Sequence, residues 1–147
     1  MKKNIFTLLG IITPVIITPI TVVSCIKVPG SQKKLTTTQI QTIENGFKFE
    51  ITEAGKKLTN EKLFELINNT YKKYETDPRT FANNLKTDKE LSKYINLDFV
   101  NINDIESGHT LRIWFTQDKD TKLPVLNWHV GCESYPNEAE GKIKLEK

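Results

Sequence analysis

The pair of side chains best suited to chemistry lies near the carboxyl-terminal end, where His129 and Cys132 are three residues apart. An imidazole and a thiol at this spacing have the composition of a metal-binding pair, or of a nucleophile with its base. A catalytic zinc site needs three protein ligands, and only His109 and scattered carboxylates remain to complete it. We therefore predict no metal, no cofactor and no catalytic residue. A thiol- or metal-assisted hydrolase at His129 and Cys132 stays open as an alternative function.

A second candidate site begins at Asp118-Lys119-Asp120, which has the acidic start of a calcium-binding loop. The fifth position of that loop is Lys122, a cation where a ligand oxygen is needed. The sixth is Leu123 in place of glycine, and the twelfth is His129 in place of the bidentate glutamate. We therefore interpret this segment as a solvated hairpin loop.

A third candidate follows from two segments, residues 110–116 and 124–130, in which apolar and polar side chains alternate as in half-buried strands. Four candidate ligand-binding residues fall on the face away from the apolar side chains: Arg112, Trp114, Asn127 and His129. An aromatic ring beside a planar cation can stack on a sugar or anchor a partner protein. If this face is not covered by helices or by the amino-terminal segment, we expect it to bind a ligand.

The secondary structure that must position these candidate residues is predicted from the spacing of apolar residues, which has one period in strands and another in helices. Period-two alternation predicts five strands, at residues 46–52, 99–105, 110–116, 124–130 and 142–146. Helical spacing predicts a helix from Thr59 to Tyr74 and two short helices after Asp77, the second opened by a capping box of Thr87 and Glu90. We expect an α+β fold with two or three helices packed on one face of a 4-5 stranded antiparallel sheet. This order of elements resembles the cystatin-like and NTF2-like rolls, in which a curved sheet wraps a helix.

The first 25 residues have the layout of an export signal. Lys2 and Lys3 precede an uncharged stretch, which ends in Val22-Val23-Ser24-Cys25. This ending resembles the lipobox of bacterial lipoproteins, and the leader, rich in Thr, Pro and Ile, resembles those of mollicute (mycoplasma-type) surface lipoproteins. The resemblance implies that a signal peptide is removed and that Cys25 receives fatty acyl chains such as palmitate. Lipidated Cys25 would tie the protein to the extracellular face of the cell membrane.

An uncleaved transmembrane helix is the rival interpretation of this segment. The uncharged residues from Ile5 to Val23 are long enough to cross a bilayer, which takes ~20 residues. Pro14 and Pro19 argue against it, because proline breaks helical hydrogen bonds and a single span has no neighbouring helix to compensate. A plain secretory signal also remains open.

Charge and cysteine content narrow the function of the rest of the chain. Two of the 21 Lys and Arg residues lie within residues 1–24, which leaves 19 against 18 Asp and Glu. Nucleic-acid binding is therefore not expected, because such proteins carry basic patches. If Cys25 is lipidated, Cys132 is the remaining thiol. We expect it either to be a buried small apolar residue or to form a disulfide-linked dimer.

These observations predict three parts: a lipoprotein signal peptide at 1–24, a lipidated cysteine and tether at 25–45, and a single α+β domain at 46–147. The predicted function is that of a membrane-anchored surface lipoprotein with a small binding domain for a protein or glycan ligand. The alternative to ligand binding, besides the hydrolase, is an envelope protein that acts on its own membrane, for example by excluding phage.

Overall fold

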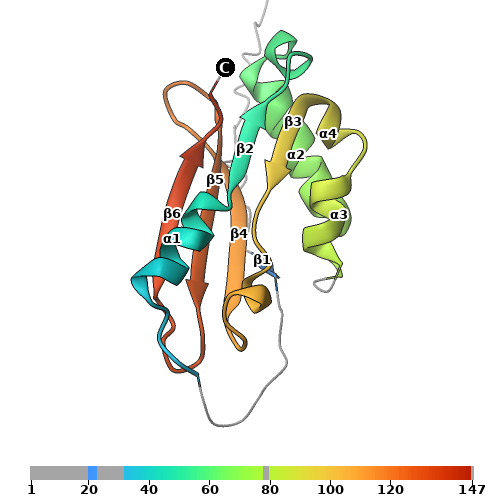
Figure 1. Cartoon of the computed structure of the whole chain (residues 1–147). Helices are drawn as coiled ribbons and strands as arrows, with labels where there is room; N and C mark the ends of the chain where they lie inside the picture. Colours follow the sequence, from blue (N-terminus) through green and yellow to red (C-terminus); the bar gives the residue numbers. More distant parts are fainter. Residues whose placement is uncertain (1–19, 23–31, 78–79, 147) are drawn as a thin grey trace, which may run out of the picture.

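The computed structural model describes residues 20–22, 32–77 and 80–146 (Figure 1). Cys25, the predicted lipidation site, lies outside these ranges. The helices are α1 Thr37–Asn45, α2 Asn60–Tyr74, α3 Phe81–Thr87 and α4 Leu91–Tyr94. The strands are β1 Ile20–Val22, β2 Lys48–Ile51, β3 Ile95–Asp98, β4 Thr110–Gln117, β5 Pro124–Gly131 and β6 Ala139–Lys144. Within the described ranges, no helix has both the length and the apolar character needed to span a bilayer.

The strands form two antiparallel sheets, and the chain has the expected α+β class. In the main sheet, β4, β5 and β6 follow one another, and the short β1 pairs with residues 111–113 at the other edge of β4. The second sheet pairs β2 with β3, so that Lys48 lies opposite Asp98. We expected one 4-5 stranded sheet for residues 46–147, and this expectation is wrong. Three strands of this segment belong to the main sheet, and the other two form the second sheet.

Aromatic packing explains why β2 does not extend the main sheet. The ring of Phe47 stacks on Trp128 at a centroid distance of 5.1 Å, and Phe49 contacts Phe115 at 5.7 Å. These contacts place β2 across the apolar face of the main sheet, where its side chains pack, and not along an edge, where its backbone would pair (Figure 1). In the described part of the chain, the expected arrangement of one curved sheet around a helix is therefore not formed.

The predicted long helix is confirmed as α2, and it supplies much of the core. Thr59 caps its first turn by accepting a hydrogen bond from the N–H of Lys62. Tyr71 is fully buried and meets the rings of Phe81 and Phe115 edge to face, at 5.1 and 6.0 Å. Helices α2, α3 and α4 lie together beside the small sheet, whereas α1 lies in front of β5 and β6 (Figure 1).

The strand expected at residues 99–105 is displaced toward the amino terminus. The structure places β3 at Ile95–Asp98, immediately after α4, where the buried side chains of Ile95 and Leu97 alternate with exposed ones. Residues Ile102–Asp104 instead form one turn of 3-10 helix, which the side chain of Asn101 caps. The apolar alternation continues from 95 to 99, so the sequence pattern alone does not show where the strand stops.

The predicted capping box of Thr87 and Glu90 is also wrong. Helix α3 extends through Thr87, whose hydroxyl donates to the carbonyl oxygen of Asn83, four residues earlier. Asp88 takes the capping role, because its Oδ1 accepts from the N–H groups of Glu90 and Leu91, each at 2.9 Å. A residue already inside one helix is not free to cap the next one.

Part of the predicted tether is ordered and packs on the domain. Helix α1 begins with a capping box in which Thr36 and Gln39 bond each other's backbone and side-chain groups. Leu35 and Ile43 are buried in the common core. Residues 32–45 therefore add to the folded unit, and only residues 25–31 of the predicted tether lie outside the described ranges.

Candidate functional site

The structure brings the four predicted ligand-binding residues together on one face of the main sheet. Arg112 lies directly opposite His129, and Trp114 lies directly opposite Asn127, across the pairing of β4 with β5. Their side chains point away from the buried residues that alternate with them. We call this surface of β4 and β5 the outer face. It forms a compact group of a guanidinium, an indole, an imidazole and an amide.

The four residues differ in how free they are to meet a ligand. Arg112 is exposed, and Trp114 and His129 are half-buried. Asn127 is buried, and its amide donates to the hydroxyl of Thr116 at 3.0 Å and to the carbonyl oxygen of Val125 at 3.2 Å. Its amide is thus already engaged within the fold, so Arg112, Trp114 and His129 are the groups left for recognition.

The Asp118 loop connects β4 to β5, and its acidic side chain serves the turn itself. Oδ1 of Asp118 accepts from the N–H and the hydroxyl of Thr121, at 2.8 and 2.7 Å, and from the N–H of Asp120. The Lys144 ammonium lies 3.2 Å from Oδ2. These hydrogen bonds, those from Thr121 foremost, hold the pKa of Asp118 well below its usual range. They are the contacts of a hairpin turn.

The contact partner of the Cys132 side chain is Glu138, and not His129 as the sequence spacing indicated. Its Sγ lies 3.7 Å from Oε1 of Glu138, and the same oxygen lies 2.6 Å from Nε2 of His109. His129 instead bonds the side-chain oxygen of Asn137 at 3.0 Å. We call His109, Cys132 and Glu138 the buried cluster. The hydrolase alternative expects Cys132 to pair with His129. In the structure Cys132 instead contacts Glu138, which also bonds His109.

The meander topology explains the buried cluster. His109 immediately precedes β4, Cys132 immediately follows β5, and Glu138 immediately precedes β6. Because successive strands run antiparallel, these three positions lie at the same end of the sheet. The N–H of Glu138 also bonds the carbonyl oxygen of Val130 at 3.0 Å, which fixes the turn. The sequence pattern did not show this set, because the last strand was expected at 142–146 and begins instead at Ala139, directly after Glu138.

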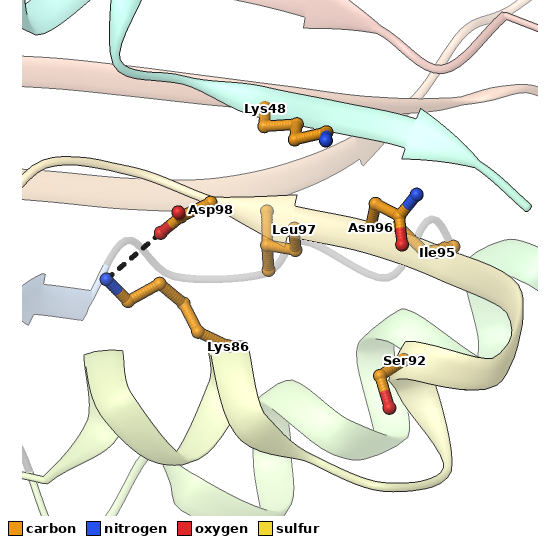
Figure 2. A pocket seen from close by; sticks show the side chains of 7 residues that line it. All are labelled: Lys48, Lys86, Ser92, Ile95, Asn96, Leu97 and Asp98. Atoms are coloured by element: carbon orange, nitrogen blue, oxygen red, sulfur yellow. Dashed lines mark ion pairs between the residues drawn. The ribbon is translucent and has the colours of Figure 1, made fainter.

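A shallow groove of about 260 Å³ lies between the small sheet and helices α3 and α4 (Figure 2). Lys86 and Asp98 face each other within it as an ion pair of 3.1 Å. Lys86 also donates to the carbonyl oxygen of Phe99 at 3.0 Å and lies over the ring of that residue. The Lys86 cation is therefore neutralised and held in place, and the second lysine that lines the groove, Lys48, forms an exposed ion pair of 3.6 Å with Glu50.

The chain matches no protein family, no curated protein and no solved structure. Among the described residues, two arrangements of side chains are candidates for a functional site. The outer face offers partly exposed groups that suit recognition. The buried cluster brings together three side chains that suit metal binding.

Proposed function

We propose that the protein is a lipid-anchored surface lipoprotein whose folded domain binds a protein or glycan through the outer face. The observation that carries the binding role is the pairing of Trp114 and Arg112 on adjacent positions of one face of β4, with His129 opposite Arg112. An indole supplies a large apolar contact at little entropic cost, and a guanidinium supplies several donors in a fixed geometry. This combination suits the ring faces and hydroxyls of a sugar, or a hot spot on a protein.

The anchor rests on the first 25 residues, and it determines where the domain acts. A diacylglyceryl group on Cys25 would supply two acyl chains, which is enough for stable membrane attachment. The folded part begins by residue 32, so a short segment would separate the membrane from the domain. The domain would then stay close to the lipid surface and face outward.

Signal cleavage would also change the main sheet. Strand β1 lies within residues 1–24, and it pairs with Leu111–Ile113 of β4. Removal of this segment would leave the backbone groups of that edge without a strand partner, and open sheet edges are sites where another chain adds a strand. Arg112 lies in the middle of this edge, so the edge and the outer face would form one continuous surface. This arrangement favours an interaction role.

Mass spectrometry of the protein extracted from its own membrane tests the anchor. We expect a mass that starts at Cys25 with two or three acyl chains attached. An intact chain from Met1 without lipid would contradict the lipoprotein and support a transmembrane anchor.

Substitution of Trp114 tests the binding face. The detergent-extracted protein is applied to arrays of glycans and of cell-surface proteins, and each signal is compared between variants. Trp114→Ala should weaken binding by roughly 30-fold, the effect of losing an aromatic hot spot worth ~2 kcal/mol. Trp114→Phe, which keeps a ring, is the matched control and should retain most of the binding.

The circular dichroism spectrum of each variant is also measured, to show whether the variant is folded. A native spectrum with unchanged binding in Trp114→Ala would contradict the proposal. A collapsed spectrum would also contradict it, because it would show that the indole serves the core and not recognition.

A further inference from the structure

The buried cluster combines three metal-ligating side chains from three separate turns of the chain. One potential ligand atom each from His109, Cys132 and Glu138 lies within 4.8 Å of the other two. His109 is 0% exposed, the side chain of Glu138 is 1% exposed, and Cys132 is 8% exposed. Acidic groups that gather at a surface are common, but a carboxylate buried beside an imidazole and a thiol requires a physical explanation.

The hydrogen bonds of the cluster leave one buried polar atom without a partner. Nε2 of His109 is bonded to Glu138, while Nδ1 of the same ring has no hydrogen-bond partner among the described residues. A buried nitrogen in this state is costly, and such atoms in native proteins commonly point to a bound ion or water. Nδ1 is not the ring nitrogen that contacts Glu138, so a metal held by the three side chains would use either Nδ1, which is unpartnered in the described part of the chain, or Nε2 in place of its hydrogen bond to Glu138.

The donor set and its dimensions suit zinc. Zinc prefers imidazole nitrogen, thiolate sulfur and carboxylate oxygen, at roughly 2.0 to 2.3 Å from the metal. In tetrahedral geometry these bond lengths separate neighbouring donor atoms by about 3.3 to 3.7 Å. Cys132 Sγ and Glu138 Oε1 are already 3.7 Å apart, whereas His109 Nε2 and the same oxygen are 2.6 Å apart. Small side-chain movements would therefore open the cluster enough to admit an ion.

We propose that His109, Cys132 and Glu138 bind one zinc ion through a nitrogen, a thiolate and a carboxylate, with a water molecule as fourth ligand. Cys132 loses its thiol proton to solvent when the metal–sulfur bond forms, because the thiolate is the ligand. The site joins the start of β4 to the turn between β5 and β6. It does not depend on the lipid anchor or on ligand binding at the outer face.

The position of the site also indicates that the metal would hold the amino-terminal segment against the folded domain. Oε2 of Glu138 accepts a hydrogen bond from the backbone N–H of Leu35, and Gln32 bonds the N–H of Ser134 in the same turn. Residues 32–35 follow the segment that leads from Cys25. The metal would therefore fasten the turn to which the membrane-linked segment attaches, and zinc should stabilise the folded protein because the unfolded chain has no preformed site.

Cobalt and zinc titrations of the detergent-extracted full chain, first stripped with a chelator, test the proposal. We expect one equivalent of Co²⁺ to produce a thiolate-to-cobalt charge-transfer band, and Zn²⁺ to displace it. Cys132→Ala should abolish the band. Glu138→Gln should weaken binding by more than about 10- to 100-fold, the range for outer groups that only orient the ligands, because it removes a ligand carboxylate.

Glu140→Gln is the matched control, because Glu140 is an exposed carboxylate of β6, two residues beyond Glu138. It should bind cobalt as tightly as the unaltered protein. Zinc should raise the Tm of the unaltered protein and leave that of Cys132→Ala unchanged. Absence of the band in the unaltered protein would overturn the proposal, and so would a band that survives Cys132→Ala or an equal loss of affinity in Glu140→Gln.

Discussion

The hydroxyl of Tyr74 donates a hydrogen bond of 2.7 Å to Oδ2 of Asp88, and this contact joins the end of α2 to the start of α4. The ammonium of Lys73 lies 2.9 Å from the same oxygen. Hydrogen bonds with Tyr74 and Asp88 raise the pKa of Lys73 to about 12. Asp88 is buried and its other oxygen caps α4, so one carboxylate organises the junction of three helices.

Asp88→Asn should therefore lower the free energy of unfolding by about 1 to 3 kcal/mol, the range for losing hydrogen bonds to a buried charged group. Chemical denaturation at neutral pH measures this change. Lys89→Ala, a neighbouring exposed residue, is the control and should change stability by less than about 0.5 kcal/mol. Equal effects of the two substitutions would show that the carboxylate does not organise the junction.

The carboxylate of Asp88 should also make the stability of the protein depend on pH in the acidic range. Burial by itself would raise the pKa of Asp88, but the N–H of Leu91, the hydroxyl of Tyr74 and the ammonium of Lys73 together hold it well below its usual range. A carboxyl whose pKa is depressed by folding stabilises the protein above its unfolded pKa of about 4. As the pH falls below that value and through the pKa of the folded state, Asp88 becomes protonated and its contribution to stability is lost. The decline in Tm below pH 4 should be shallower in Asp88→Asn.

Gly141 is the residue on which Trp128 packs, and it should not tolerate a side chain. The two residues lie directly opposite each other on β5 and β6, and a Cβ on Gly141 would meet the indole ring at 2.7 Å. Trp128 is itself stacked on Phe47 and cannot move away freely. Gly141→Ala should cost about 1 to 3 kcal/mol of stability by overpacking. Thermal unfolding measures the loss, and a Tm equal to that of the surface control Lys142→Ala would contradict this account.

Cys132 should behave as a protected thiol. Its side chain is buried, and its backbone N–H is held by the carbonyl oxygen of Tyr135 at 2.8 Å. In chelator-treated native protein, alkylation should be roughly 100-fold slower than in denaturant, because reagent access requires local opening. The rate of iodoacetamide labelling, followed by mass spectrometry, checks this. Equal rates in the two states would instead favour the reactive thiol of a hydrolase, and a disulfide-linked dimer on a non-reducing gel would show that Cys132 reaches the surface.

Local sequence patterns predicted several elements well because their stabilising contacts repeat along the chain. Helical spacing of apolar residues predicted a helix from Thr59 to Tyr74, and α2 begins one residue later, at Asn60. Strict alternation identified β4 and β5, and hence the face on which Arg112, Trp114, Asn127 and His129 lie. Such elements carry their own periodic signal, so no distant contact is needed to recognise them.

Other features were decided by contacts between residues far apart in the sequence. The division into two sheets follows from Phe49 packing on Phe115, a contact that spans most of the domain. The location of β3 depends on its pairing with β2, since its apolar alternation continues beyond the strand. Neither pairing partner can be read from a local hydrophobic period, because the period fixes which face is buried and not what covers it.

The sequence by itself determined the α+β class, the long helix, the β4–β5 hairpin with its outer face, and the resemblance of the leader to a lipoprotein signal. Only the tertiary structure placed His109 and Glu138 beside Cys132, because Cys132 lies 23 positions after His109 in the sequence. The physical reason is that an antiparallel meander returns the chain to the same end of the sheet at every second turn. Side chains next to those turns become neighbours through topology, whereas His129, close to Cys132 in sequence, bonds Asn137 instead.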